Sequence, residues 1–285
     1  MEKILLDKAD DIYENFEAFV NGSKKGSFPL PAGAANILLW YNRPSPYSAV
    51  TGLTPKDIER TVYFSAWLVT DPKDTGLKKG DVLSDTEYEA AKTEYGYGSF
   101  EAGQGAETFD AFLRSIDLDT LYDSLRTEEI SHMAELEKTT GWRGTGHLNE
   151  KEKKHVRKVR AELEDIRFKI DAVMYLRGNP DTFLIREISL FPLNLRGAAE
   201  RMSGVTPYGI FHDIESLYED VFLRAERLRK LIDMNVPYIV LRNEKRMLQE
   251  TVDRLIANGM RGRPETKGDG IPLFCLSDLL LRDAM

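Results

Sequence analysis

The chain has 285 residues, a formal net charge of -8 and a single cysteine, Cys275. With 42% hydrophobic and 30% charged residues, its composition is that of an ordinary folded protein, which excludes collagen-like, low-complexity and wholly disordered classes. No apolar run approaches the roughly 20 residues that span a bilayer, and one cysteine builds neither a disulfide framework nor a thiolate metal cluster. We therefore expect a cytoplasmic protein in a reducing compartment, with no membrane partner.

Charge is distributed unevenly along the chain. Residues 1–150 carry 15 Lys and Arg against 26 Asp and Glu, whereas residues 151–285 carry 24 against 21. This pattern excludes a uniformly basic nucleic-acid binder. It leaves open either one locally basic working face or two solvated surfaces of different sign.

The first third of the chain predicts small elements. Apolar residues at helical spacing predict an amphipathic helix over residues 1–22, followed by a polar linker. The Pro-rich, aromatic stretch over residues 28–53 predicts a short buried strand and turns. Thr54 is the expected N-cap of a helix that begins at Pro55.

A strand, a helix and a Gly-rich loop are expected next. Residues 61–70 (TVYFSAWLVT) are β-branched and aromatic, which predicts a strand. Ser84 and Glu87 have the spacing of a capping box and predict a helix from Ser84 to Thr93. The Gly-rich segment Tyr95–Glu107 lacks the Lys-Ser/Thr of a phosphate-binding loop, so we expect it to cap the following helix.

The middle of the chain predicts two long helices, over residues 105–138 and 148–177, joined by a short polar turn as an antiparallel hairpin. The basic cluster Lys151–Arg160 is either a patch for an anionic partner or a solvated helix face, and its interleaved Glu favours the second. A strand is expected over residues 182–191 and an irregular loop over residues 193–211.

The sharpest pattern lies between residues 212 and 259. Ile214, Val221 and Leu228 are seven residues apart, and a second apolar series follows the break at Asp233–Pro237. Two heptad-like helices joined by a tight turn predict an antiparallel coiled-coil hairpin with densely charged outer faces. Such a hairpin buries little of itself and is typical of a docking element.

Catalytic constellations are absent from the sequence. The four histidines, His132, His147, His155 and His212, lack metal-ligand spacing. The acidic side chains of Asp117, Asp119 and Asp123 lie at a helix start, where the macrodipole favours acids without any metal. We predict no catalytic residue, no metal ligand and no cofactor in this chain.

Several long motifs resemble the beta-prime subunit of bacterial DNA-directed RNA polymerase. They are RNEKRMLQE (Arg242–Glu250), VDRLIANGMRGRPET (Val252–Thr266), and the upstream blocks IERTVYFSAWLVTDP, IDLDTLYDSLR and RGNPDTFLI. The resemblance covers roughly residues 28–281, in order. It implies an α+β, mainly α fold: a clamp-like domain with short strands and a projecting antiparallel coiled-coil hairpin.

The resemblance also implies a division of the chain and a set of site residues. We expect an unrelated N-terminal helix and linker (1–26), a clamp-like region (27–211), the coiled-coil hairpin (212–259) and a rudder-like loop with the end of the chain (260–285). In this family the hairpin is the main docking site for the sigma factor, and the rudder lies near the template DNA. The positions that match sigma contacts are Arg224, Arg227, Arg242, Glu244, Arg246 and Gln249, and those implied to contact nucleic acid are Arg261, Arg263 and Lys267.

The sequence departs from the family in several places. The Cys-rich zinc module and the triple-Asp loop that holds Mg²⁺ in the full polymerase have no counterpart here. Gly270, Ile271 and Phe274 stand where the rudder usually carries basic residues, which weakens the expected contact with DNA.

Three hypotheses remain open from the sequence. The first is a polymerase part, a clamp segment that assembles with a sigma factor and other RNA polymerase subunits and is not catalytic alone. The second is a stand-alone sigma-binding decoy or adaptor derived from the polymerase clamp. The third is a degenerate fragment without a native role. We favour the first, because the resemblance extends over the whole chain and not only over the hairpin.

Overall fold

The computed structural model describes residues 27–37, 45–141, 148–190 and 207–278. The helix and linker expected over residues 1–26 lie outside the described residues. The fold is α+β and mainly helical, as predicted from the sequence. No helix in the described part of the chain combines the length and the apolar character needed to cross a bilayer.

The elements follow one another in a simple order. The strands are β1 (Ser27–Ala35), β2 (Trp67–Asp71), β3 (Val82–Leu83), β4 (Glu101–Gly103) and β5 (Leu184–Ser189). The helices are α4 (Pro46–Thr51), α5 (Pro55–Val62), α6 (Asp85–Tyr95), α7 (Ala106–Arg114), α8 (Leu118–Thr140), α9 (Glu150–Gly178), α11 (Pro207–Asp233) and α12 (Tyr238–Ala257).

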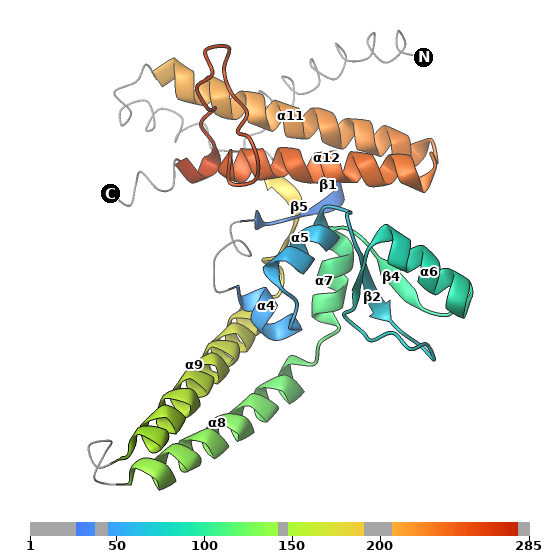
Figure 1. The fold of residues 1–285 in the computed structure, drawn as a ribbon. Coiled ribbons are helices and arrows are strands. Elements are labelled where there is room, and N and C mark those ends of the chain that lie inside the picture. The colour runs from blue at the N-terminus through green and yellow to red at the C-terminus, as the bar shows by residue number, and fades with distance from the viewer. Residues whose placement is uncertain (1–26, 38–44, 142–147, 191–206, 279–285) are drawn as a thin grey trace.

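Two helical hairpins extend from a small central body (Figure 1). The body contains the antiparallel pair β1–β5, the three-stranded sheet β3–β2–β4, and the short helices α4 to α7. The α8–α9 hairpin, which we call the arm, points away from the body, and the end of α8 and the start of α9 lie farthest from it. The α11–α12 hairpin lies across the opposite side of the body, next to β1 and β5.

Helix starts follow the capping residues read from the sequence. The Thr54 hydroxyl accepts a hydrogen bond from the Asp57 amide, and Pro55 occupies the first turn of α5. Ser84 and Glu87 form the expected capping box at the start of α6. In the Gly-rich segment, Gly105 stands at the N-cap of α7, as predicted.

The strand predicted over residues 61–70 is wrong in its first half. Thr61 and Val62 complete helix α5, where both are fully buried, and the left-handed backbone of Phe64 (φ 59°) ends that helix. The strand β2 begins only at Trp67. The prediction fails because Thr61 and Val62 lie on the buried face of α5. Burial there outweighs the modest intrinsic preference of β-branched residues for strands.

The single helix predicted over residues 105–138 is in fact two helices, α7 and α8. Asp117 starts α8 as its N-cap, because its carboxylate accepts hydrogen bonds from the amides of Asp119 and Thr120. This break turns the chain from the body into the arm.

The loop expected over residues 193–211 is wrong at its C-terminal end. Helix α11 begins at Pro207, so the hairpin starts five residues before the predicted boundary at residue 212. Proline suits the first turn of a helix, where its missing N–H leaves no hydrogen bond unmade.

The core connects the body to both hairpins. The Phe28 ring of β1 meets the Phe222 ring of α11 edge to face, with ring centroids 5.4 Å apart. Tyr47 of α4 contacts Phe183, just before β5, in the same way at 5.0 Å. These aromatic contacts join segments that are far apart in the sequence, and each buries a large apolar area.

A glycine at the junction of α5 and α7 provides a test of this packing. Gly105 has φ 92°, and a β-carbon there would lie 2.4 Å from the Phe64 ring. We expect Gly105→Ala to destabilise the protein by about 2–4 kcal/mol, because backbone strain and steric overlap add. Gly52 has φ 73° with open space around it, so Gly52→Ala should cost only about 1–2 kcal/mol. Urea unfolding measures both, and equal losses would contradict the overlap with Phe64.

Candidate functional site

The α11–α12 hairpin has the buried seam that the heptad spacing predicts. Ile214, Val221 and Leu228 are at most 3% exposed, and they belong to the same hydrophobic core as Leu248 and Val252 of α12. The two helices run antiparallel and meet at the turn Asp233–Pro237 (Figure 1). The apolar seam leaves the charged side chains on the flanks of the hairpin.

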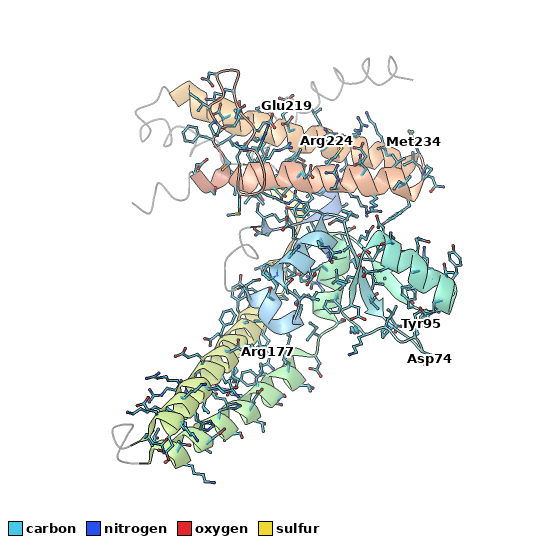
Figure 2. The ribbon with its side chains drawn as sticks, in the orientation of Figure 1. Asp74, Tyr95, Arg177, Glu219, Arg224 and Met234 are labelled. Carbon is cyan, nitrogen blue, oxygen red and sulfur yellow. The ribbon has the colours of Figure 1, made fainter. Side chains whose placement is uncertain are left out.

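A carboxylate on α12 holds two guanidinium groups of α11. Glu244 is 5% exposed; its Oε1 lies 2.9 Å from Arg227 Nη2, and its Oε2 lies 3.8 Å from Arg224 Nη1. Arg224 Nη1 also donates to the Met247 thioether at 3.7 Å. Figure 2 shows Arg224 midway along the hairpin, with Met234 at its turn. Arg227 is thus held by a short ion pair and Arg224 by longer contacts, and both guanidinium groups remain partly exposed.

Two further predicted residues of α12 differ in exposure. Arg246 is partly exposed, pairs with Glu250 one turn later and donates to the Asn243 side chain at 3.0 Å. Gln249, in contrast, is 2% exposed. Its amide nitrogen donates to the Ala35 carbonyl at 3.1 Å, and its amide oxygen accepts from the Ala35 amide at 2.6 Å.

Gln249 belongs to a buried polar network that fastens α12 to the body. Its amide nitrogen also donates to Asp253 Oδ1 at 2.6 Å, and the Tyr63 hydroxyl donates to Asp253 Oδ2. Burial raises the pKa of Asp253 to about 7, although the hydrogen bonds from Tyr63 and Gln249 and the nearby Arg261 favour the charged form. The network joins α12 to β1 and to the end of α5.

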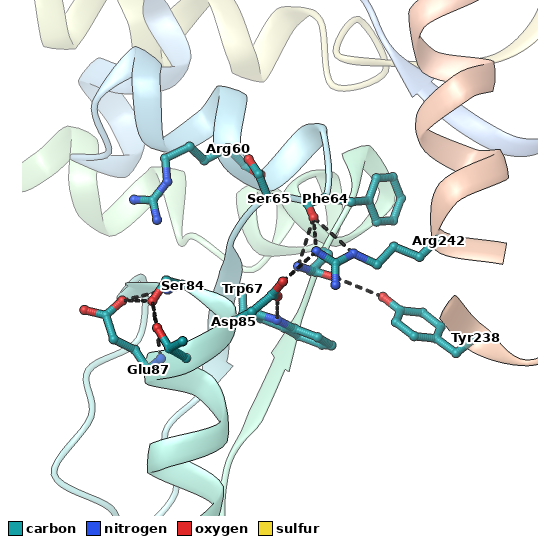
Figure 3. Close-up of polar contacts among 11 residues, drawn as sticks. Arg60, Phe64, Ser65, Trp67, Ser84, Asp85, Glu87, Tyr238 and Arg242 are labelled. Carbon is teal, nitrogen blue, oxygen red and sulfur yellow. Dashed lines mark hydrogen bonds and ion pairs between the residues drawn. The ribbon is translucent and has the colours of Figure 1, made fainter. Parts of the chain in front are cut away.

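Arg242 makes the second attachment, near the turn of the hairpin (Figure 3). Its Nε donates to the Phe64 carbonyl at 3.1 Å, and its Nη2 lies 3.1 Å from Asp85 Oδ2. The Trp67 indole donates to the same carboxylate at 2.8 Å, and the Tyr238 hydroxyl reaches Gln104 at 3.4 Å. Burial alone would raise the pKa of Asp85, but the hydrogen bonds from Arg242 and Trp67 outweigh it and lower that pKa. The Arg242 guanidinium is therefore already bound to two groups of this chain, the Phe64 carbonyl and the Asp85 carboxylate.

The loop after α12 carries the three residues predicted to contact nucleic acid. Arg261 lies over the Tyr63 ring, with its guanidinium carbon 3.4 Å from the ring centroid, and donates to Glu59 at 3.1 Å. Lys267 forms a 2.8 Å ion pair with the buried Asp213 of α11. Arg263 is exposed and lines a cavity of about 300 Å³ together with Arg254 and Arg261, among others. Contact of these residues with nucleic acid stays a prediction.

Metal ligands do not cluster within the described residues, where no group of three or more His, Cys, Asp or Glu could hold an ion. Asp117 serves as a helix cap, and Asp119 pairs with Arg177. His132 of α8 lies beside the carboxylate of Glu162 of α9, and His155 of α9 lies beside that of Glu135 of α8. Cys275 is a buried free thiol. His147 lies outside the described residues, and His212 falls in the first turns of α11.

Comparison with known proteins identifies the family. The family model described as RNA polymerase Rpb1, domain 1, matches residues 39–280. The chain belongs to this family. The DNA-directed RNA polymerase subunit beta' of Alkaliphilus oremlandii is 36% identical over 261 residues, which cover 92% of this chain and 20% of that subunit.

Other beta' subunits match the chain to a similar extent. That of Caldanaerobacter subterraneus subsp. tengcongensis is 37% identical over 264 residues, and that of Weissella hellenica is 34% identical over 264 residues, each covering 92% of this chain. These matches cover 20% and 23% of the two subunits, so the chain spans about a fifth of the length of the relatives it matches. The resemblance to the RNA polymerase beta' family inferred from sequence motifs is confirmed.

The attachments of α12 to the body were not evident from the sequence. Arg242 and Glu244 belong to a charged stretch that predicts an outer helix face, and Gln249 is one of the residues matched to sigma contacts. The structure instead buries Glu244 and Gln249 and pairs Arg242 with the body. The one signal in the sequence is that the polar Gln249 directly follows the apolar Leu248. If Gln249 lies near the same buried side of the helix, its amide needs hydrogen-bond partners in the body.

The buried carboxyl of Asp253 predicts an unusual pH dependence of stability. Its pKa is about 7 in the folded chain and about 4 in the unfolded chain, so between these values the folded state binds the extra proton. This group therefore lowers the free energy of unfolding as the pH rises from 4 to 7, by about 1.4 kcal/mol per pH unit at most. Asp253→Asn keeps the shape and removes the titration.

The measurement is urea unfolding of the wild-type chain and of Asp253→Asn at pH 5, 6 and 7. All other carboxyl groups are shared, so the difference between the two proteins isolates Asp253. We expect the wild-type chain to lose about 2–3 kcal/mol relative to the variant between pH 5 and pH 7. Parallel pH profiles would contradict the raised pKa.

Proposed function

We propose that the chain forms part of the clamp of a bacterial RNA polymerase and docks a sigma factor on the α11–α12 hairpin. The relatives that it matches over 92% of its length are DNA-directed RNA polymerase beta' subunits. Membership of that family supports assembly with other polymerase subunits in the cytoplasm. Docking of a sigma factor rests on the residues of the hairpin itself.

The pair Arg224 and Arg227, both held by the buried Glu244, carries this proposal. Their side chains are 32% and 52% exposed, so one side of each guanidinium faces the interior and the rest faces solvent. A guanidinium group presents several donors in a fixed plane, and fixing its position in advance lowers the entropy lost on binding. Such groups suit the acidic and polar side chains of a partner helix.

The six residues predicted to bind sigma take different roles in this proposal. Arg224, Arg227 and Arg246 contact the partner directly, because their guanidinium groups are partly exposed. Glu244 and Gln249 are positioning residues, since both are buried: the first orients the arginines and the second holds α12 on the body. Arg242 acts in the same way through Asp85 and the Phe64 carbonyl.

A role near template DNA follows from the loop after α12. Arg263 is exposed, whereas Arg261 and Lys267 are engaged with Glu59 and Asp213. We infer that DNA contact by this loop is weak or occurs only within the assembly. The chain lacks the Asp-rich Mg²⁺ loop of the family, so nucleotide addition would require other parts of the polymerase.

Arg224→Ala tests the docking proposal. The internal contacts of Arg224 are long, at 3.7 Å to Met247 and 3.8 Å to Glu244, so its removal should leave the hairpin folded. We expect binding of the primary sigma factor of the source organism to weaken by about 1–3 kcal/mol, measured by calorimetry at moderate salt. Arg160→Ala, on the arm, makes the same chemical change elsewhere and should leave the affinity unchanged.

Equal affinities for Arg224→Ala and the wild-type chain would remove Arg224 from the interface. No sigma binding by the folded wild-type chain would overturn docking altogether.

A further inference from the structure

The Gly-rich segment Tyr95–Glu107 lines one part of a cavity of about 670 Å³. Helices α6 and α7 supply most of the remaining wall, and strand β4 lies within the Gly-rich part. Figure 1 shows these elements in the part of the body that carries the three-stranded sheet. The residues proposed above to dock a sigma factor, and those of the loop after α12, do not line this cavity. Its role is therefore separate from both.

Aromatic rings form much of the cavity wall. The ones that line it are Tyr88, Tyr97, Phe100 and Phe112. Phe100 and Phe112 are at most 8% exposed, and the Tyr88 ring is stacked on Trp67 with ring centroids 3.8 Å apart. Between these rings the lining residues are small, as at Ala102 and Ala111, which leaves room for a ligand. Flat apolar walls of this kind suit a planar aromatic group.

The turn that carries Tyr97 has its shape without any ligand. Gly96 and Gly98 have left-handed backbones, with φ 92° and 81°, which glycine adopts without strain. The Ser99 hydroxyl donates to the Gly96 carbonyl at 2.6 Å, and the Lys73 ammonium donates to the Gly98 carbonyl at 3.1 Å. Tyr97 itself is 86% exposed. A ligand ring can therefore stack on Tyr97 with little ordering of the turn.

One ammonium group lies among these rings. Lys92 Nζ is 4.2 Å from the ring centroid of Tyr88 and 5.4 Å from that of Tyr97. It pairs with Glu89 at 3.1 Å, but the Glu89 side chain is 63% exposed, and an ammonium group has three N–H donors. Lys92 can therefore bind a second acceptor at the cavity without losing Glu89.

The other polar groups of the lining are engaged within the chain. The hydroxyls of Thr70, Thr108 and Ser115 each donate to a backbone carbonyl, at 3.3, 2.9 and 2.6 Å. The Glu101 carboxylate pairs with Lys73 at 3.2 Å. Among the described residues that line the cavity, Lys92 is thus the one cation and the main donor for a ligand. This set of groups favours one anionic group on an apolar ring over a sugar, which needs many free donors and acceptors.

We propose that this cavity binds a small, planar aromatic carboxylate. The ligand ring packs against the aromatic wall beside Tyr97, and the carboxylate accepts a charge-assisted hydrogen bond from Lys92. The cavity volume lies within the range of small-molecule sites, and it accommodates two fused aromatic rings.

The test compares two probes of the same shape, 2-naphthoate and the uncharged 2-naphthamide, by calorimetry on the purified 285-residue chain. Lys92→Met keeps the length of the side chain and removes its charge. We expect this variant to bind 2-naphthoate about tenfold more weakly and 2-naphthamide unchanged, because only the carboxylate uses the ammonium group. Tyr97→Ala removes a stacking surface, so it should weaken both probes by about fivefold.

A matched control separates the cavity from overall charge. Lys138→Met makes the same change at an exposed lysine of α8, on the arm, and should bind both probes as the wild-type chain does. Lys92 and Tyr97 both retain solvent exposure, so their variants should stay folded, which circular dichroism checks.

Three outcomes would overturn the proposal. Equal losses of 2-naphthoate binding in Lys92→Met and Lys138→Met would reduce the effect to net charge. Binding that neither Lys92→Met nor Tyr97→Ala weakens would place the probe outside this cavity. No binding of 2-naphthoate at millimolar concentration by the folded wild-type chain would leave the cavity without this ligand class. None of these results bears on the docking of a sigma factor, which uses other residues.

Discussion

The buried hydrogen bonds of Gln249 with the backbone of Ala35 are the connection on which the rest of the hairpin depends. They join the middle of α12 to strand β1, across 214 positions of sequence, in a place that water does not reach. An amide buried there is costly unless both its donor and its acceptor are satisfied, so only one register of α12 on the body is stable. Asp253 and Tyr63 extend the same connection to α5. A coiled coil alone fixes its own seam but not its orientation on a neighbouring domain.

This fixed register determines where the charged groups of the hairpin lie. With Gln249 anchored, Glu244 comes to lie one and a half turns earlier on α12, facing α11, where Arg224 and Arg227 reach it. A carboxylate that is 5% exposed would be destabilising without those cations, and the cations in turn lose conformational freedom. Arg242 sets the other end of α12 against Asp85. The hairpin is thus a support whose partly exposed guanidinium groups are held on their inner side by Glu244.

The sequence predicts those parts of this arrangement that are local or periodic. The caps at Thr54 and Ser84 and the seam of α11 depend on neighbours within one or two turns, and they are found as predicted. The failures have tertiary causes. Thr61 and Val62, where a strand was predicted to begin, are helical because the body buries that face of α5. No pattern around Gln249 reveals that its hydrogen-bond partner is Ala35. Residues that look like one outer surface in the sequence therefore divide into exposed contacts and buried supports.

The two hairpins illustrate opposite uses of basic residues. On the α11–α12 hairpin the arginines are oriented by acceptors of the chain itself, such as Glu244 for Arg227, so their direction is restricted and part of their charge is neutralised. Directional groups of this kind discriminate between partners. At the end of the arm, the exposed Lys154 and Arg157 have no carboxylate partner among the described residues, so no ion pair fixes their direction. The basic residues of the described chain therefore divide into those that an acceptor of the chain holds in place and those that remain unpaired at the surface.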